Sequence, residues 1–328
     1  MPPIRRLGNP RPRAGGGARL RPVAGTAASG ERVIHVACAA RRDYVPHCAA
    51  MLHSALRRCD DHRIHVHFLH GPDLPRRRRE RLAAMVERDG GEISFLEVAD
   101  ERVAGLRSSE QLPPSHWYRV FLPELLPELD RILYLDADII VLESLWPLWE
   151  TPLQGNLLAA VTNVFQLDHL SHLDRLEIAR PESYFNSGVM VMDLAAMRAA
   201  DATRAVLEYA EANYDRLRLP EQDALNVVLG DRRLPLHPRW NCMNSVLAFP
   251  WAADVLGAEA VEEARRAPAL RHFEGPSVNK PWHILCEREM RELYLEHRRH
   301  TPWPRVRPVG VTPRNLLRRL RRRGAPTP

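Results

Sequence analysis

The sequence almost lacks lysine. Of the 47 basic residues in this chain of 328, Lys280 is the one lysine and all the others are arginines. A lysine carries a compact ammonium on a flexible stem, whereas an arginine carries a planar guanidinium, so the two are not interchangeable. Lys280 is therefore either present by chance or placed where an ammonium is needed. The residues around it distinguish these two interpretations.

Paired cysteines and long apolar runs are also missing. The five cysteines are odd in number and show no C-x-x-C spacing, which favours reduced thiols over a disulfide framework or a zinc pattern. No stretch approaches the roughly eighteen apolar residues that cross a bilayer, and the first residues lack the apolar core of a signal peptide. These absences predict a cytoplasmic protein that is neither exported nor membrane-spanning.

Acidic residues are absent from both ends of the chain. Residues 1–30 contain six arginines and no acid, and residues 304–328 contain eight arginines and no acid. Taking these fourteen charges from the formal net charge of +6 leaves about −8 for the region between them. A nucleic-acid binding fold carries its basic face on the fold itself. We therefore expect no nucleic-acid partner.

The two basic ends differ in their expected structure. Residues 1–30 are rich in Arg, Pro and Gly and have few apolar side chains, so we expect a disordered leader. The tail places Leu316, Leu317 and Leu320 among arginines, which suits an amphipathic helix on an anionic membrane surface or, equally, a solvated basic end. The expected division is a leader over 1–30, a folded domain over 31–285, and a helical extension with a basic tail over 286–328.

Between these ends, strand-like and helix-like patterns alternate. The expected strands cover residues 33–37, 64–69, 92–98, 131–135, 157–161, 188–194 and 270–273. The expected helices begin at Pro46 and cover residues 75–88, 116–126, 195–214 and 220–229. This order predicts an α/β fold, a single doubly wound Rossmann-like domain with a mostly parallel central sheet. Ligands of such folds bind beyond the carboxyl ends of the strands.

An acidic pair, Asp136-Ala137-Asp138, lies between two apolar runs. Residues 132–135 precede it and residues 139–142 follow it. A bare D-x-D is often a solvated turn, but here the two carboxylates are forced to a sheet edge between buried segments. Their mutual repulsion there is relieved when a cation lies between them. Mg²⁺ or Mn²⁺, with coordination positions left open for phosphate oxygens, fits such a pair.

Three further polar segments could carry chemistry. Asn186-Ser187-Gly188 precedes an apolar strand, although this triplet is also common in plain turns. Glu221, Gln222 and Asp223 open a helix, where simple capping is the alternative. Residues 272–282, HFEGPSVNKPW, combine an imidazole, a Gly-Pro turn and the single lysine, which are suitable parts of a polyanion site.

In this order the motifs resemble glycosyltransferase family 8, the family of glycogenin and of bacterial lipopolysaccharide galactosyl- and glucosyltransferases. The resemblance runs from about residue 33 to 283. Its motifs are ACAA (37–40) followed by DY (43–44), WYR (117–119), YLDADIIV (134–141), FNSGVMVMDL (185–194), EQDALN (221–226) and HFEGPSVNKPWH (272–283). It implies a GT-A fold over 31–285 and a hexosyltransferase that uses a nucleotide-sugar donor, usually a UDP-sugar. It also implies Mn²⁺, or Mg²⁺, a saccharide or lipid-linked acceptor, and retention of anomeric configuration.

The resemblance also implies a role for individual residues of these motifs. Asp136, Asp138 and His272 would hold the metal, and Gly275 and Lys280 the diphosphate. The donor would contact Ala39, Asp43, Tyr44, Arg119, Asp136, Ala137, Asp138, Asn186, Glu221, Gln222, Gly275 and Lys280. The catalytic group would comprise Arg119, Asn186, Gln222 and Asp223. Breaking the bond from sugar to phosphate develops charge on the diphosphate, which a metal and an ammonium stabilise. Lys280 thus stands where an ammonium is useful.

The nucleophile and the donor base stay open. The resemblance favours front-face attack, in which the departing phosphate helps to deprotonate the acceptor, with Asp223 as the nearest alternative carboxylate. Family members commonly read A-A-D-D where this chain has arginines at 41 and 42, and arginine has no acceptor for the uracil N3 proton. The base contact therefore differs, comes from Asp43, or is lost. Glu221 stands where the family has aspartate, which leaves the sugar open. The alternative function is a non-catalytic nucleotide-sugar binding protein.

Overall fold

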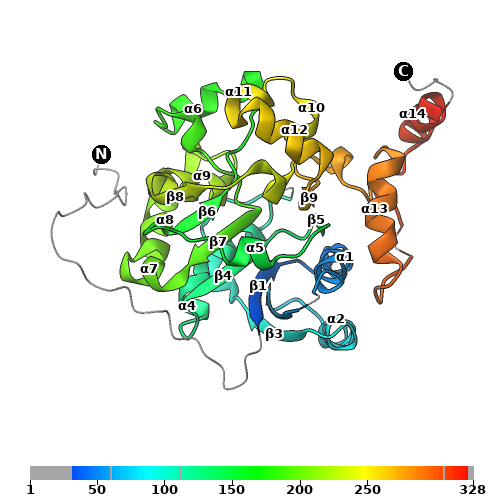
Figure 1. The fold of residues 1–328 in the computed structure, drawn as a ribbon, viewed down its shortest axis with the longest axis horizontal. Coiled ribbons are helices and arrows are strands. Elements are labelled where there is room, and N and C mark those ends of the chain that lie inside the picture. Colours follow the sequence, from blue (N-terminus) through cyan, green and yellow to red (C-terminus); the bar gives the residue numbers. More distant parts are fainter. Residues whose placement is uncertain (1–31, 60, 111, 306, 324–328) are drawn as a thin grey trace.

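A seven-stranded sheet forms the centre of the molecule (Figure 1). The computed structural model describes residues 32–59, 61–110, 112–305 and 307–323, so the expected leader over 1–30 lies outside the described residues. The strand order is β3-β2-β1-β4-β7-β6-β8. The strands are β1 (Val33–Ala39), β2 (Arg63–His70), β3 (Glu92–Glu97), β4 (Arg131–Leu135), β6 (Leu158–Ala160), β7 (Val189–Asp193) and β8 (Arg233–Pro235).

Most neighbouring strands of this sheet are parallel. β1 pairs in parallel with β2 and β4, β2 with β3, and β6 with β8, whereas β7 runs antiparallel to both β4 and β6. Helices cover both faces of this sheet, so its central strands are buried on both sides, which explains the nearly continuous apolar runs in β4 and β7. The predicted α/β fold with a mostly parallel sheet is confirmed, and β7 is its reversed strand.

Helices cover both faces of the sheet. Val36, Val66 and Phe68 face one side and pack in a core with Met51 and Leu52 of α1, while the other face packs against the 3₁₀ helix η1 (Pro114–Phe121), α7, α8 and α9. The helices are α1 (Val45–Leu56), α2 (Arg76–Arg88), α3 (Asp100–Val103), α4 (Leu122–Leu125), α5 (Trp146–Trp149), α6 (Ser171–Arg175), α7 (Leu194–Ala199), α8 (Ala202–Ala212), α9 (Pro220–Leu229), α10 (Asn244–Ala248), α11 (Ala252–Leu256), α12 (Ala258–Arg266), α13 (Arg288–Arg298) and α14 (Pro313–Arg323).

Two of the expected helices are interrupted. The helix predicted over 195–214 is wrong as one element, because Asp201 adopts a left-handed conformation (φ 53°) that ends α7 and starts α8. The helical stretch predicted over 116–126 is η1 followed by α4. Pro123 occupies the first turn of α4, where its missing N–H costs no hydrogen bond, but it could not continue the preceding helix.

The strand expected over 270–273 forms, but outside the main sheet. It is β9 (Leu270–His272), which pairs antiparallel with β5 (Ile139–Val141) in a separate two-stranded sheet. The register places Ile139 opposite His272. The short second sheet thereby brings the segment that follows the acidic pair beside the late histidine.

The two C-terminal helices differ in how they contact the core. α13 packs on α1, where the Tyr294 hydroxyl lies 2.6 Å from His47 Nδ1 and the Trp282 ring stacks on the same imidazole. α14 stands clear of the sheet (Figure 1), and Leu316 and Leu317 on it are 44% and 58% exposed. Within the described ranges, no helix combines the length and apolar character needed to cross a bilayer.

Candidate active site

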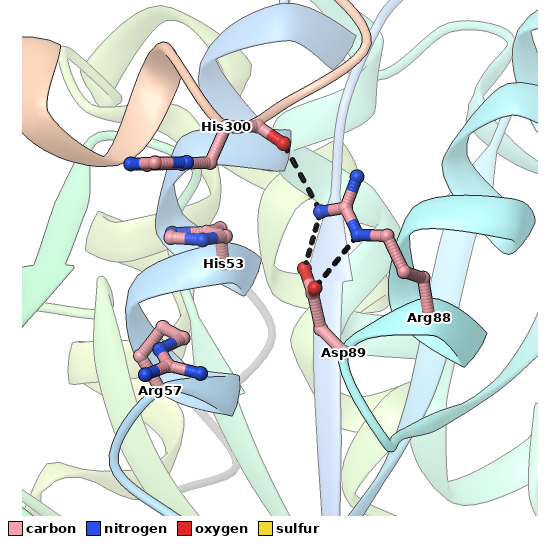
Figure 2. A pocket seen from close by; sticks show the side chains of 5 residues that line it. All are labelled: His53, Arg57, Arg88, Asp89 and His300. Carbon is pink, nitrogen blue, oxygen red and sulfur yellow. Dashed lines mark hydrogen bonds and ion pairs between the residues drawn. The ribbon is translucent and has the colours of Figure 1, made fainter.

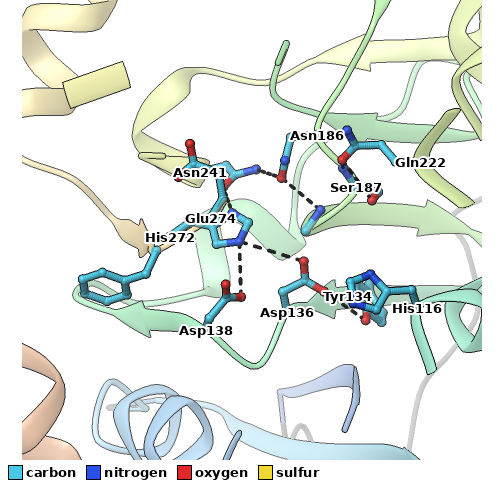
Figure 3. A network of polar contacts seen from close by, with 12 residues as sticks. His116, Tyr134, Asp136, Asp138, Asn186, Ser187, Gln222, Asn241, His272 and Glu274 are labelled. Carbon is cyan, nitrogen blue, oxygen red and sulfur yellow. Dashed lines mark hydrogen bonds and ion pairs between the residues drawn. The ribbon is translucent and has the colours of Figure 1, made fainter. Parts of the chain in front are cut away.

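The acidic pair lies at the carboxyl end of β4. The strand is buried up to Leu135, and the chain then leaves the sheet, with the Asp136 N–H donating to the Gly188 carbonyl (2.8 Å). The side chain of Asp136 is 25% exposed and that of Asp138 is 10% exposed. Figure 3 shows both carboxylates directed toward one imidazole. Two anions this close and this poorly solvated need a compensating positive charge.

That imidazole belongs to His272, which β9 carries to the pair. Its Nε2 lies 3.3 Å from Asp138 Oδ1 and 3.9 Å from Asp136 Oδ2. Each of the three residues offers a ligand atom within 4.8 Å of the other two. A set of two carboxylates and one imidazole can hold Mn²⁺ or Mg²⁺. The fold thus brings together the three residues predicted as metal ligands, although they span 137 positions of the chain.

Asn241, which the sequence did not point to, orients this histidine. The fully buried Asn241 amide donates from Nδ2 to Asn186 Oδ1 (2.9 Å), so its own Oδ1 faces His272 Nδ1 (2.8 Å). An amide oxygen only accepts, so Nδ1 carries a proton and Nε2 is the nitrogen that faces the carboxylates. In the singly protonated ring, the Nε2 lone pair is directed toward the two carboxylates. This arrangement is favourable when a cation or a proton lies between them.

Gly188 explains the Asn-Ser-Gly segment. A Cβ on this residue would lie 2.4 Å from His272 Cε1 and 2.7 Å from Asp136 Oδ2. Such contacts would push the imidazole and the carboxylate apart. The glycine is therefore required by close approach at the site, and the plain-turn interpretation of the triplet is insufficient.

Lys280 reaches the other oxygen of Asp138. Its ammonium donates to Asp138 Oδ2 and to the Phe273 carbonyl (2.9 Å). Burial alone would raise the pKa of the Asp138 carboxyl, but Lys280 and His272 together hold it below its ordinary value. Burial would likewise lower the pKa of Lys280, and Asp138 raises it above the usual range. Both groups are thus charged, and the position of the single lysine is not a matter of chance.

A buried arginine holds Asp136 from the opposite side. Arg119, 3% exposed, donates to Asp136 Oδ1 (2.8 Å) and to the Ser187 carbonyl (2.8 Å). The Tyr134 hydroxyl donates to the same carboxylate oxygen (3.2 Å). Burial would lower the pKa of Arg119, but Asp136 is the largest of the neighbours that raise it above the ordinary value. The guanidinium therefore stays charged and fixes the outer carboxylate.

Glu221 extends the same network. Its Oε1 lies 3.9 Å from Arg119 Nη2 and 3.8 Å from His116 Nδ1, and Ser187 Oγ donates to it (3.4 Å). Burial would raise the pKa of this carboxyl, but the neighbouring His116 and the charge of Arg119 lower it to about 2. Glu221 is therefore an ionised acid beside the site and more than a helix cap.

Gln222 and Asp223 follow on α9 but occupy different environments. Gln222 Oε1 accepts from the Ser187 N–H (3.0 Å), which places its amide next to the Asn-Ser-Gly turn. Asp223 has no exposed surface. Its carboxylate accepts hydrogen bonds from the Tyr184 hydroxyl (2.5 Å) and from the N–H groups of residues 218 (2.7 Å) and 219 (2.9 Å), and His172 Nε2 lies 2.9 Å away. With both oxygens engaged, Asp223 is built to position α9, and the geometry favours it less as an attacking group.

The segment expected to read the base lies beyond Ala39, at the end of β1. Arg41 donates to both carboxylate oxygens of Asp43 (3.0 and 2.7 Å), and the Asp43 side chain is 59% exposed. The Tyr44 ring meets Trp282 edge-on at 5.5 Å. The carboxylate that could replace the missing family acid is thus accessible, but it already has an arginine partner.

Gly275 lies on an exposed loop between His272 and Lys280. Its φ of +90° is open to glycine and strained for other residues. Glu274 anchors this loop, because its Oε1 accepts from the Ser245 N–H (2.9 Å) and its carbonyl accepts from the Asn244 amide (2.7 Å). The loop therefore presents backbone groups beside the lysine.

Two cavities lie away from the acidic pair, and no residue of the pair lines either. One, of about 410 Å³, is lined by His53, Arg57, Arg88, Asp89 and His300 (Figure 2), and Arg88 in it pairs with Asp89 (2.8 Å). The other, of about 400 Å³, is lined by Arg42, Pro75, Arg77, Arg78, Arg81 and Trp303. The second lining holds four arginines and no acid, so it is suited to anions.

Comparison with known proteins gives a consistent result. The sequence model described as Glycosyl transferase family 8 matches residues 35–286. General stress protein A of Bacillus subtilis is 29% identical over 279 residues, which are 83% of this chain and 96% of that protein. The lipopolysaccharide 1,2-glucosyltransferase of Escherichia coli is 26% identical over 227 residues, 68% of this chain and 65% of that protein.

A solved structure agrees with this match. The galactosyltransferase LgtC in complex with donor and acceptor sugar analogs superimposes with a TM-score of 0.74 and 27% identity. The superposition covers 82% of this chain and 96% of that chain. Sequence and fold therefore point to the same group of enzymes.

Proposed function

The chain belongs to glycosyltransferase family 8 and is a hexosyltransferase, and from this premise we propose that its donor is a UDP-sugar. The enzyme moves the hexosyl group to a saccharide or lipid-linked acceptor and retains the anomeric configuration. The reaction requires a divalent cation. The names of its relatives support this acceptor class, because one is a lipopolysaccharide glucosyltransferase and another is a galactosyltransferase crystallised with donor and acceptor sugar analogs.

One observation carries the metal dependence. Asp136, Asp138 and His272 direct acceptor atoms at one another, and Asn241 holds the imidazole so that its lone pair faces the carboxylates. These three residues would hold Mn²⁺, or Mg²⁺. The bound ion would neutralise charge on the diphosphate of the donor. Lys280, whose ammonium donates to Asp138, would add a second positive charge beside the diphosphate.

The residues of the chain support a front-face reaction. The bond from the anomeric carbon to the phosphate oxygen breaks, its electron pair goes to the diphosphate, and Lys280 with the backbone of Gly275 stabilises that charge. The acceptor hydroxyl oxygen bonds to the same face of the carbon, and its proton passes to the departing phosphate oxygen. We assign Gln222 to the position nearest the anomeric carbon. Asp223, which has no exposed surface, holds the start of α9 in place.

The donor contacts are proposals of the same kind. Arg119, Asn186 and Glu221 would meet the sugar, because all three are buried around Ser187 at the edge of the metal site. Ala39, Asp43 and Tyr44 would meet the base. Ala137 would lie against the donor between the two carboxylates.

The C-terminal segment supports a place at a membrane surface. We assign residues 31–285 to the GT-A domain and 286–328 to an extension that lies on an anionic membrane at the cytoplasmic face. Leu316 and Leu317 on α14 are exposed, and Arg318 between them and the chain end is exposed as well. The four-arginine cavity beside Trp303 adds a second cationic surface.

The experiment is a donor panel. The purified chain is incubated with UDP-, GDP-, CDP- and ADP-sugars and Mn²⁺, and sugar release or transfer is measured. We expect turnover with a UDP-sugar that falls by at least about 10³-fold in Asp138→Asn, while the exposed Glu80→Gln on α2 retains it.

Two results would count against the proposal. Turnover that does not depend on metal or on Asp138 would refute the assigned site. Metal-dependent nucleotide binding without any turnover would favour the alternative of a non-catalytic binding protein.

A further inference from the structure

A second group of potential metal ligands lies at the opposite end of the sheet. His35 on β1 and His65 and His67 on β2 each offer a ring nitrogen within 4.8 Å of the other two. Within the described residues, this group and the acidic triad are the two sets of three that could hold a metal ion. The site proposed above uses none of these histidines.

The strand register explains why the three rings meet. β1 and β2 are parallel, with His35 opposite His65 and Ala37 opposite His67. Alternate residues of a strand share a face, so all three imidazoles project from the same side of the sheet. His35 and His65 are the third residues of their strands, which places the group near the amino ends.

The spacing of the nitrogens suits a tetrahedral ion. His35 Nδ1 lies 3.0 Å from His67 Nε2, and the rings of His65 and His67 stack with centroids 4.4 Å apart. Two nitrogens bound to Zn²⁺ at tetrahedral angles lie about 3.3 Å apart. A small adjustment of the rings would therefore meet that geometry.

Without an ion, one buried nitrogen of this group lacks a hydrogen-bond partner in the described part of the chain. His67 is 5% exposed, and its Nδ1 has no hydrogen-bond partner among the described residues.

The surroundings provide oxygen atoms near the rings. Ser94 Oγ lies 2.8 Å from His65 Nε2, and the Glu92 carboxylate, which pairs with Arg63 (3.0 Å), lies 3.9 Å from His65 Nδ1. His65 is 25% exposed at its side chain, which leaves an entry path from solvent. The other histidine group, at the cavity in Figure 2, differs because His53 and His300 share it with Arg57 and Arg88, whose charges would repel a metal ion.

From this geometry we propose that His35, His65 and His67 form a second metal site, which binds a transition-metal ion such as Zn²⁺ and joins β1 to β2. Imidazole-only sets favour Zn²⁺ over Mn²⁺ and Mg²⁺, which prefer oxygen. The bound ion would tie the amino ends of the two strands together and stabilise the folded chain.

The test is a Zn²⁺ titration of the full chain in an Asp138→Asn background, which weakens the acidic triad. Competition with a chromophoric chelator gives the stoichiometry and the dissociation constant. We expect one Zn²⁺ per chain, bound at least roughly 100-fold more weakly once His65→Asn is added. The matched control His169→Asn, an exposed histidine of η2 (Leu167–His169), leaves the affinity unchanged.

Co²⁺ provides a second readout. A tetrahedral nitrogen site gives Co²⁺ a strong visible absorption, which we expect to be lost in the His65 variant and retained in the His169 variant. If His65→Asn does not fold by circular dichroism, His35→Asn replaces it in the same comparison. The proposal would be overturned by equal Zn²⁺ affinity with and without His65. It would also be overturned if the Asp138→Asn chain bound no Zn²⁺.

Discussion

The two triads occupy opposite ends of one sheet and differ in their chemistry. At the carboxyl end of β4, two carboxylates and one imidazole are surrounded by Lys280 and Arg119. At the amino ends of β1 and β2, three imidazoles lie together beside Ser94. The first set is rich in oxygen and suits Mn²⁺ or Mg²⁺, and the second contains nitrogen alone and suits Zn²⁺.

The surroundings of the two triads differ as well. The acidic triad has cations on two sides, a histidine whose tautomer is set by Asn241, and Gly188 to admit close approach. The histidine triad has a buried nitrogen without a partner among the described residues. The first set is suited to an anionic substrate, and the second is suited to a bound ion.

Replacing the lysine tests whether the cation at the acidic end is part of that arrangement. Lys280→Arg keeps the charge but substitutes a planar guanidinium for a compact ammonium. We expect turnover to fall by roughly 10²- to 10³-fold, because the positive charge that would stabilise the diphosphate is moved from its position. Steady-state rates with the best donor measure this effect.

The matched control is Arg76→Lys, the reverse exchange at an exposed position of α2. It should leave turnover within error of the parent chain. Full activity in Lys280→Arg would remove the functional distinction between the two ends that rests on this lysine.

Acid titration sharpens the same comparison, because the acidic end depends on ionised carboxyls. The pKa of Glu221 is lowered to about 2, so its ionised form is stabilised by the fold. This contribution is present above the ordinary pKa of 4.5 and is lost as the pH falls from there toward 2. We expect Glu221→Gln to lower the free energy of unfolding by roughly 3 kcal/mol at pH 7.

Urea unfolding between pH 7 and pH 3 measures the difference in free energy of unfolding between the parent chain and the variant, which is the gap. The gap should shrink below about pH 4.5, whereas Glu80→Gln, which removes an exposed carboxyl, should show no comparable change. A constant gap over this range would contradict the charge network around Arg119.

The smallest expected effect concerns the orientation of His272. Asn241→Ala removes the acceptor that holds the Nδ1 proton, so the lone pair is no longer directed at the carboxylates. We expect Mn²⁺ affinity to weaken about 10- to 100-fold. Calorimetric titration with Mn²⁺ measures this change, and Asn315→Ala on α14 is the control. Unchanged affinity would show that the acidic triad binds its ion without this support.

Much of the site was accessible from the sequence because its motifs are local. The apolar run before Asp136 predicted β4 and its polar end, and the single lysine marked residue 280. Asn241 gave no such signal, since it lies outside every motif and acts through one amide oxygen. The break at Asp201 was missed for a similar reason, because a left-handed residue leaves no mark on the apolar pattern.

The sequence by itself determined the α/β alternation, the family resemblance and the residues at the carboxyl ends of the strands, because periodicity and motifs are properties of neighbouring positions. The tertiary structure decided which distant residues meet. The separate pairing of β5 with β9 carries His272 to the acidic pair, and the parallel register of β1 with β2 assembles the histidine triad. Which strands pair, and in which register, depends on two segments far apart in the chain, so neither segment alone reveals the pairing.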